Sequence, residues 1–143
     1  MQDFVHLHVH TQYSLLDGQA SVARLVDKAM KNGMKGIAVT DHGNMFGIKE
    51  FTNYVNKKNS GPKGEVKDLK KRIAGIEAGT IECEDKEAEI AACKAKIVEA
   101  ENKLFKPIIG CEMYVARRTM DLKEGKPDQS GYHLIVLAKN ETG

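Results

Sequence analysis

Residues 36–44 read GIAVTDHGN, and this stretch sets the fold class. Its apolar part predicts a short buried strand over Ile37–Thr40, and its polar part predicts a turn over Asp41–Asn44. Apolar residues at helical spacing predict one helix before it, over 20–31, and a second helix after it, over 45–57. Helices on both sides of a buried strand are typical of α/β proteins with parallel strands.

Three more segments are expected to be strands. KPIIGCEMYVA contains an apolar run over 108–115, and YHLIVLAKN, residues 132–140, predicts another buried strand. The strict alternation in FVHLHVH, residues 4–10, places three histidines on one face and predicts a first strand. We therefore expect an α/β fold with mostly parallel strands, open or barrel-like. Three aromatic side chains are expected in its core: Phe4, Phe46 and Phe51.

Residues 60–105 differ in character from the rest of the chain. Between residues 63 and 106 there are ten basic and ten acidic side chains, so the net charge of this part is zero. Apolar residues recur at helical spacing on both sides of Gly79 and Thr80, which predicts two antiparallel helices. Balanced charge is typical of solvated helical faces, whereas a DNA-binding helix needs an unbalanced basic stripe. We expect a helical hairpin over 60–105 that does not bind DNA.

Composition limits the other possibilities. A chain of 143 residues with 41% hydrophobic content suits one compact domain. Its net charge of +2 is too small to indicate nucleic-acid binding by itself. Three cysteines without CxxC spacing indicate neither a disulfide framework nor a zinc knuckle, and they fit a reducing cytoplasm. Because no apolar stretch approaches the length of a membrane span, we expect no membrane association.

Histidines and carboxylates at predicted strand ends suggest a metal site. His8 and His10 are two residues apart on a predicted strand, so both rings leave the same face and could hold one ion or two adjacent ions. Glu112 interrupts an apolar strand, where burial of its charge requires a nearby cation. Carboxyl ends of parallel strands meet at one rim, which is where we expect His8, His10, Asp41, His42 and Glu112, with Asp17 a further candidate ligand.

The alternative to a metal site is that these histidines are hydrogen-bonded structural residues. A strand histidine is more often hydrogen-bonded than metal-bound, and the HxH spacing alone occurs by chance in many proteins. Several histidines at strand ends together with Glu112 favour the metal site. We expect His6 and Asp41 to support the ligands rather than to be ligands themselves.

Four segments resemble a known family in their order along the chain. FVHLHVHTQYSLLDG, GIAVTDHGNMFG, KPIIGCEMYV and YHLIVLAKNETG resemble the opening of the PHP domain in bacterial DNA polymerase III α subunits. The HxH and TDH elements are shared with other PHP proteins such as histidinol phosphatases, whereas SLLDG and HLIVLAKN resemble the polymerase branch. The resemblance covers residues 4–56 and 106–143, so the helices at 60–105 look like an insertion.

This resemblance implies the N-terminal portion of a (β/α)7-like barrel over residues 1–143, ending before later ligand motifs. It implies two or three divalent ions, zinc or manganese, in the complete domain, and 3′ to 5′ phosphodiester hydrolysis. The parent protein would be a bacterial cytoplasmic DNA polymerase whose partners are a DNA primer end and other replicative subunits, including a proofreading exonuclease. The implied metal ligands are His8, His10, Asp17, His42, Glu112 and His133.

Two other functions are compatible with these residues, and the position of His133 differs from that of the other ligands. The chain could be a free-standing phosphomonoesterase, or a scaffold that braces a polymerase and uses metal only for stability. Periodicity places His133 at the start of its strand, away from the rim that carboxyl strand ends form. Its place among the ligands therefore rests on the resemblance alone.

Overall fold

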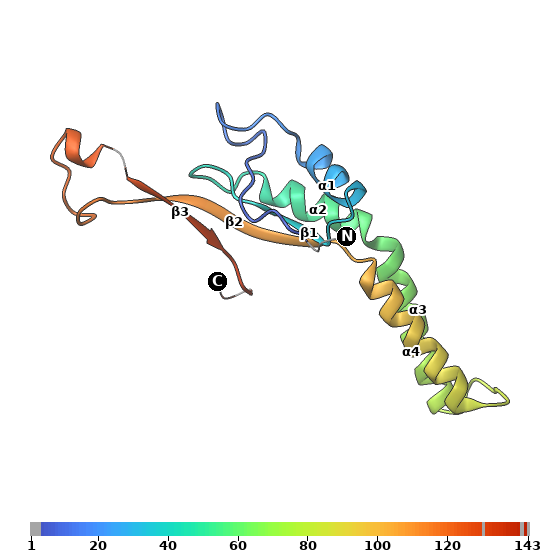
Figure 1. Ribbon diagram of the computed structural model, residues 1–143. Coiled ribbons are helices and arrows are strands. Elements are labelled where there is room, and N and C mark those ends of the chain that lie inside the picture. The colour runs from blue at the N-terminus through green and yellow to red at the C-terminus, as the bar shows by residue number, and fades with distance from the viewer. Residues whose placement is uncertain (1–3, 130, 141, 143) are drawn as a thin grey trace. The chain divides into compact units, whose positions relative to one another are not determined.

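The computed structural model describes residues 4–129, 131–140 and 142, and these belong to two compact units (Figure 1). One unit is formed by Met1–Val55 with Lys106–Gly143, and the other by Asn56–Phe105. The first unit contains a three-stranded sheet in the order β1-β2-β3. Its strands are β1 (Gly36–Val39), β2 (Lys106–Val115) and β3 (Tyr132–Leu137). The chain is thus an α/β protein, as the sequence predicts.

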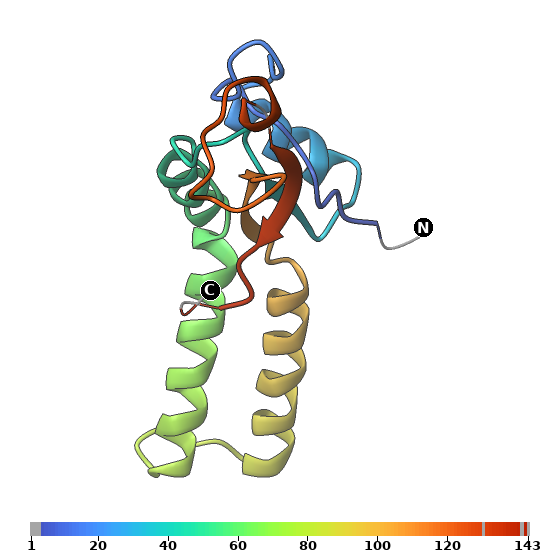
Figure 2. The same ribbon diagram turned by 90° about the vertical axis from the view of Figure 1, so that its left-hand side faces the viewer.

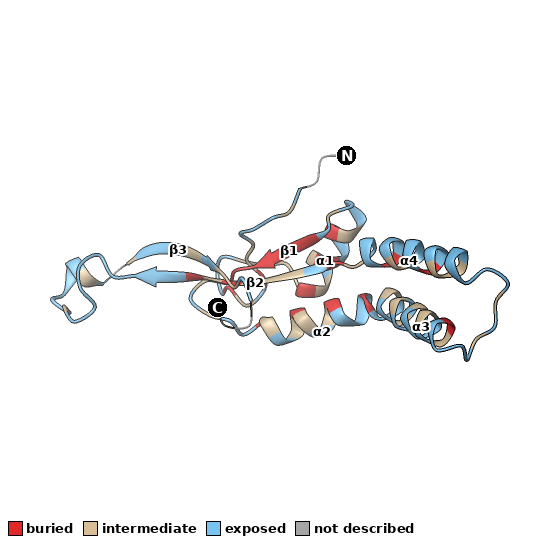
Figure 3. Cartoon of the chain, turned by 90° about the horizontal axis from the view of Figure 1, so that it is seen from below, coloured by how far each residue is buried: buried red, intermediate tan, exposed pale blue. Residues whose placement is uncertain are grey.

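Helix α1 (Val22–Lys31) packs against β1 and confirms the first predicted helix. The Ser21 hydroxyl accepts a hydrogen bond from the Arg24 backbone N–H and caps the helix. Val22, Val26 and Ala29 recur at helical spacing and are buried with β1, which is coloured as buried along its length in Figure 3. Burial of this stripe explains why the amphipathic sequence forms a helix here.

Helix α2 (Ile48–Lys58) begins three residues later than predicted. The preceding residues form a turn, because the Asn44 side chain accepts a hydrogen bond from the Phe46 backbone N–H. Phe51 is completely buried on α2, as predicted. The expectation that Phe4 and Phe46 are core residues was wrong, since they are 56% and 78% exposed.

The sheet is mixed. Strands β1 and β2 pair in parallel from Gly36 opposite Lys106 to Val39 opposite Ile109, as expected for strands joined through helices. Strand β3 pairs antiparallel with β2, and the expectation that it is buried was wrong, since Tyr132, Leu134 and Val136 are exposed. The connection between them has one short 3₁₀-helix, Lys126–Asp128, and no described α-helix that could bring the chain back for a parallel crossover.

The predicted first strand over residues 4–10 was wrong. The segment runs beside β1, where the Ala38 N–H donates to His6 O and the Thr40 N–H donates to Val9 O, both at 2.9 Å. Three residue steps on this segment therefore match two on β1, as in a bulge. The extra residue breaks the alternation and leaves Leu7 51% exposed.

The second unit consists mainly of two helices, α3 (Ser60–Glu77) and α4 (Lys86–Asn102), which run side by side (Figure 2). The predicted break at Gly79 and Thr80 falls directly after α3, where Gly79 has a φ of 72°. At the base of this hairpin, the Asn59 side chain bonds both the carbonyl oxygen and the N–H of Phe105. No helix in the described part of the chain is both long and apolar enough to cross a membrane.

Candidate metal centre

The parallel register of β1 and β2 continues beyond β1 and brings two site residues together. His42 lies opposite Glu112 in an isolated bridge with the same offset as the β1–β2 pairs. The Glu112 N–H donates to Asp41 O at 3.1 Å, and the Gly43 N–H donates to Glu112 O at 2.8 Å. The polar turn after β1 is therefore held against β2 by backbone hydrogen bonds.

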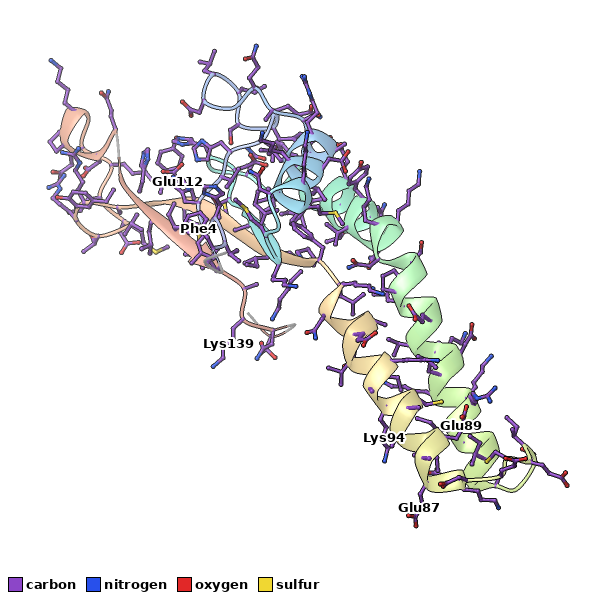
Figure 4. All side chains as sticks on the ribbon, turned by 45° about the vertical axis from the view of Figure 1, so that its right-hand side comes forward. Phe4, Glu87, Glu89, Lys94, Glu112 and Lys139 are labelled. Carbon is purple, nitrogen blue, oxygen red and sulfur yellow. The ribbon has the colours of Figure 1, made fainter. Side chains whose placement is uncertain are left out.

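Glu112 is the centre of a histidine cluster on β2, and its position is labelled in Figure 4. Only 7% of the residue is exposed. Its Oε2 lies 2.7 Å from His10 Nε2 and 3.0 Å from His42 Nδ1, and its Oε1 lies 3.0 Å from His133 Nδ1. Three imidazole rings from separate segments thus surround one carboxylate.

The histidines keep this buried carboxylate ionised. Burial raises the pKa of Glu112, but hydrogen bonds from His42 and His133, together with the electrostatic effect of the neighbouring imidazole rings, lower it further than burial raises it. The net result is a pKa below the ordinary value of a glutamate. An ionised carboxylate only accepts hydrogen bonds, so the Nδ1–H groups of His42 and His133 donate to it.

His10 has a geometry that differs from the other two. Its Nε2 is close to Glu112 Oε2, yet the two atoms do not meet the angular requirements of a hydrogen bond. This Nε2 is buried and has no hydrogen-bond partner among the described residues. Buried polar atoms without a partner are rare and call for an explanation. A cation that accepts lone pairs from both atoms would satisfy them.

Two groups of ligand atoms share the glutamate. His8, His10 and Glu112 form one group, and His42, Glu112 and His133 form the other, with the ligand atoms of each group within 4.8 Å of one another. Imidazole nitrogen and carboxylate oxygen suit zinc, manganese and iron. The residues present therefore fit one ion or two adjacent ions, and Glu112 would be a ligand in either case.

Antiparallel pairing explains how His133 reaches this cluster. His133 is the second residue of β3 and pairs with Tyr114 near the end of β2. Because β3 runs opposite to β2, the start of β3 lies beside the end of β2. A strand start and two parallel strand ends thus meet at one rim.

The other expected site residues lie at different distances from the cluster. Asp17 Oδ2 is 3.6 Å from His42 Nδ1, and the Asp17 side chain is half exposed. His6 is exposed, packs edge-on against Phe4, and belongs to neither ligand group. Asp41 is buried and accepts hydrogen bonds from the Thr11 N–H, the Thr11 hydroxyl and the Ser14 hydroxyl. Asp41 fixes the loop that follows His10.

Sequence reasoning missed Tyr114, whose hydroxyl contacts His42 Nε2. Its ring also packs edge-on against the rings of His42 and His133 at centroid distances of 4.9 and 5.1 Å. A Cβ atom on Gly43, which has a φ of +65°, would lie 3.0 Å from the Tyr114 ring. Tyr114 is two residues after Glu112, so the period of a strand could have placed both on one face.

Comparison with known proteins identifies the family of the chain. The PHP domain family matches residues 6–143, and the chain belongs to this family. It is 39% identical over 141 residues to DNA polymerase III subunit alpha of Treponema pallidum (strain Nichols), covering 98% of this chain and 8% of the relative. It is 31% identical over 148 residues to the subunit of the same name from Aquifex aeolicus (strain VF5), covering 99% of this chain and 9% of the relative. The chain thus spans less than a tenth of the length of these relatives.

Proposed function

We propose that the rim around Glu112 holds divalent metal ions, zinc or manganese. The ligands would be His8, His10, Asp17, His42, Glu112 and His133. The observation that carries this proposal is the buried Nε2 of His10, which faces a glutamate oxygen at 2.7 Å without making a hydrogen bond. Imidazole nitrogen and carboxylate oxygen are the kinds of atom that bind these ions, and a bound ion would give the buried Nε2 a partner.

The reaction we propose for this centre is hydrolysis of a phosphodiester at a DNA 3′ end. Bound divalent ions would supply Lewis acidity, lowering the pKa of water and neutralising charge on the phosphate oxygens. The chain's own residues orient the centre: Glu112 belongs to both ligand groups, and Asp41 fixes the loop between His10 and Asp17. Tyr114 and Thr40 hold imidazole nitrogens that do not face Glu112.

The parent protein would be the α subunit of a bacterial replicative DNA polymerase, with this chain as part of its PHP barrel. The names of the relatives and their coverage of nearly the whole chain support this proposal. Nucleotide addition would then belong to parts of the subunit outside this region. Its partners would be a primer end and other replicative subunits, including a proofreading subunit, in the cytoplasm. The hairpin over 60–105 would be an insertion without a role in the metal centre.

The test compares two histidines of the cluster with one outside it. In the complete α subunit, His8→Ala with His10→Ala should abolish metal-dependent 3′ to 5′ cleavage, because one of the two ligand groups loses two of its three ligands. Nucleotide addition should stay largely intact, since it would use a separate site. His6→Ala is the matched control, because His6 is exposed and outside both ligand groups.

Cleavage and bound metal are measured on the same preparations. Loss of both in the double variant, with neither lost in the His6→Ala control, is the expected result. Wild-type cleavage in the double variant would refute the exonuclease assignment and favour a structural role for this domain.

A further inference from the structure

We propose that the Thr40 hydroxyl is a positioning group that fixes His8 with its proton on Nδ1 and a lone pair on Nε2. Thr40 directly follows β1 and is completely buried. No metal is needed for this arrangement, so the tautomer can be tested separately. Its role in metal binding rests on the proposed metal centre.

Three contacts of Thr40 Oγ1 define the hydrogen-bond pattern. The Val9 N–H donates to Oγ1 at 3.0 Å, His8 Nδ1 lies 2.9 Å from Oγ1, and Oγ1 lies 3.3 Å from Val9 O. A hydroxyl has one proton to donate and two lone pairs that accept. All three contacts are hydrogen bonds when Thr40 donates to Val9 O and accepts from the Val9 N–H and from a His8 Nδ1–H.

The opposite tautomer makes fewer hydrogen bonds. If His8 Nδ1 carried a lone pair, the single Thr40 proton would have to point at Nδ1, and the contact with Val9 O would be lost. One lone pair of Oγ1 would then have no donor among these three contacts. A buried hydroxyl that forms fewer hydrogen bonds is less stable, so the geometry favours the proton on Nδ1.

With its proton on Nδ1, His8 has a lone pair on Nε2 that can bind a metal ion. His8 shares a ligand group with His10 and Glu112, and its Nδ1 is occupied by Thr40. Nε2 is therefore the atom that can act as a ligand. His42 differs, because its Nδ1–H donates to Glu112 in the metal-free cluster and must change before that nitrogen can bind an ion. Of these two rings, only that of His8 already has, without metal, the tautomer that metal binding requires.

The first experiment measures the tautomer in the metal-free chain of 143 residues. Long-range ¹H–¹⁵N spectra are recorded at a pH high enough that the His8 ring signals no longer change with pH. We expect a protonated Nδ1 in the wild type, loss of that preference in Thr40→Val, and its return in Thr40→Ser, which keeps the hydroxyl. A wild-type His8 with its proton on Nε2 would overturn the proposal without any variant.

The second experiment measures Zn²⁺ affinity by calorimetry in a double-mutant cycle. Thr40→Val should weaken binding by about 10- to 100-fold, as is usual for partners that orient a metal-binding histidine, and Thr40→Ser should restore most of it. In a His8→Ala background, Thr40→Val should have little further effect. An equal loss in both backgrounds would mean that Thr40 acts on the fold rather than through His8. If the wild type bound no Zn²⁺, the proposed metal centre would fail, while the spectra would still decide the tautomer.

Discussion

The sheet-containing unit and the hairpin unit differ in how many polar side chains they bury. The first unit buries Thr11, Ser14, Thr40, Asp41 and Glu112 beside its apolar core. In the described hairpin, Asn59 is the one buried polar residue, and the charged side chains of α3 and α4 face water. Figure 4 shows Glu87 and Lys94 projecting from α4.

The free energy of burying polar groups explains why this difference matters. A buried polar group costs free energy unless it is hydrogen-bonded, so a cluster of them persists only where each finds partners. Exposed pairs such as Arg72 with Glu89, 2.8 Å apart, contribute less than about 1 kcal/mol. The hairpin can therefore vary its surface freely, whereas the site has little tolerance for change.

The largest stability effect is expected for Asp41→Ala. Asp41 accepts three hydrogen bonds from Thr11 and Ser14, all of them buried, and its removal leaves the Thr11 N–H without this partner. The free energy of opening of β1 and the neighbouring loop should fall by about 4 kcal/mol. Amide hydrogen exchange measures each unit separately. Equal losses in β1 and in α3 would show that the two units are not independent, contrary to the comparison.

A medium effect is expected for Asn59→Ala, the buried exception within the hairpin. Its side chain satisfies both the N–H and the carbonyl of Phe105, at 2.9 and 2.8 Å. Loss of both bonds should destabilise α3 and α4 by about 2 kcal/mol. Asn53→Ala, an exposed asparagine on α2, is the control and should change stability by less than about 0.5 kcal/mol. A similar result for both variants would mean that burial is not what makes Asn59 important.

A smaller effect is expected for Asp85→Ala, the hairpin counterpart of the Asp41 variant. Asp85 is exposed and caps α4 by accepting one hydrogen bond from the Ala88 N–H. Its removal should cost about 1 kcal/mol in the exchange of α4 amides. If buried hydrogen bonds matter more than exposed ones, Asp41→Ala lowers the free energy of opening clearly more than Asp85→Ala does. The reverse order would contradict the comparison of the two units.

The smallest effect concerns Asp128, an aspartate of the first unit that lies outside its core. Hydrogen bonds from Arg118, and one from the Glu124 N–H, hold the pKa of Asp128 below its ordinary value. The folded chain thus favours the ionised form, so the stabilisation is fully present above the unfolded pKa of about 3.9 and is lost as the pH falls through the lower folded pKa.

Asp128→Asn provides the measurement. The difference in unfolding free energy between wild type and variant should be small near neutral pH and should shrink as the pH falls below about 4. A difference that grows on acidification would have the wrong sign and would exclude the Arg118 bond as its source.

Local patterns predicted most of the elements correctly. Helix α1 follows from its apolar spacing and the Ser21 cap, and α3 and α4 follow from helical spacing on either side of Gly79. Strands β1 and β2 follow from their apolar runs. These predictions succeeded because the responsible interactions lie within a few residues along the chain.

The segment over residues 4–10 shows where local pattern fails. Its alternation is that of a strand, yet an extra residue against β1 interrupts the ladder between His6 and Val9. A bulge depends on the partner strand, and the alternating sequence contains no signal for it. The exposure of Phe46 has a different, local cause, since the Asn44 side chain and the Phe46 N–H form a turn before α2 begins.

The sequence alone determined which residue types are available for the site and the order in which they occur: an HxH pair, a histidine after a buried strand, and a glutamate within an apolar one. Sequence periodicity gave His133 no place beside them, and only the tertiary structure explains how it joins them, because this depends on β3 running antiparallel to β2. It also decided that Thr40 meets His8 and that Tyr114 meets His42, contacts between residues 32 and 72 positions apart. The physical reason is that sequence periodicity fixes the face on which a side chain lies, whereas strand direction and register fix which side chains meet there.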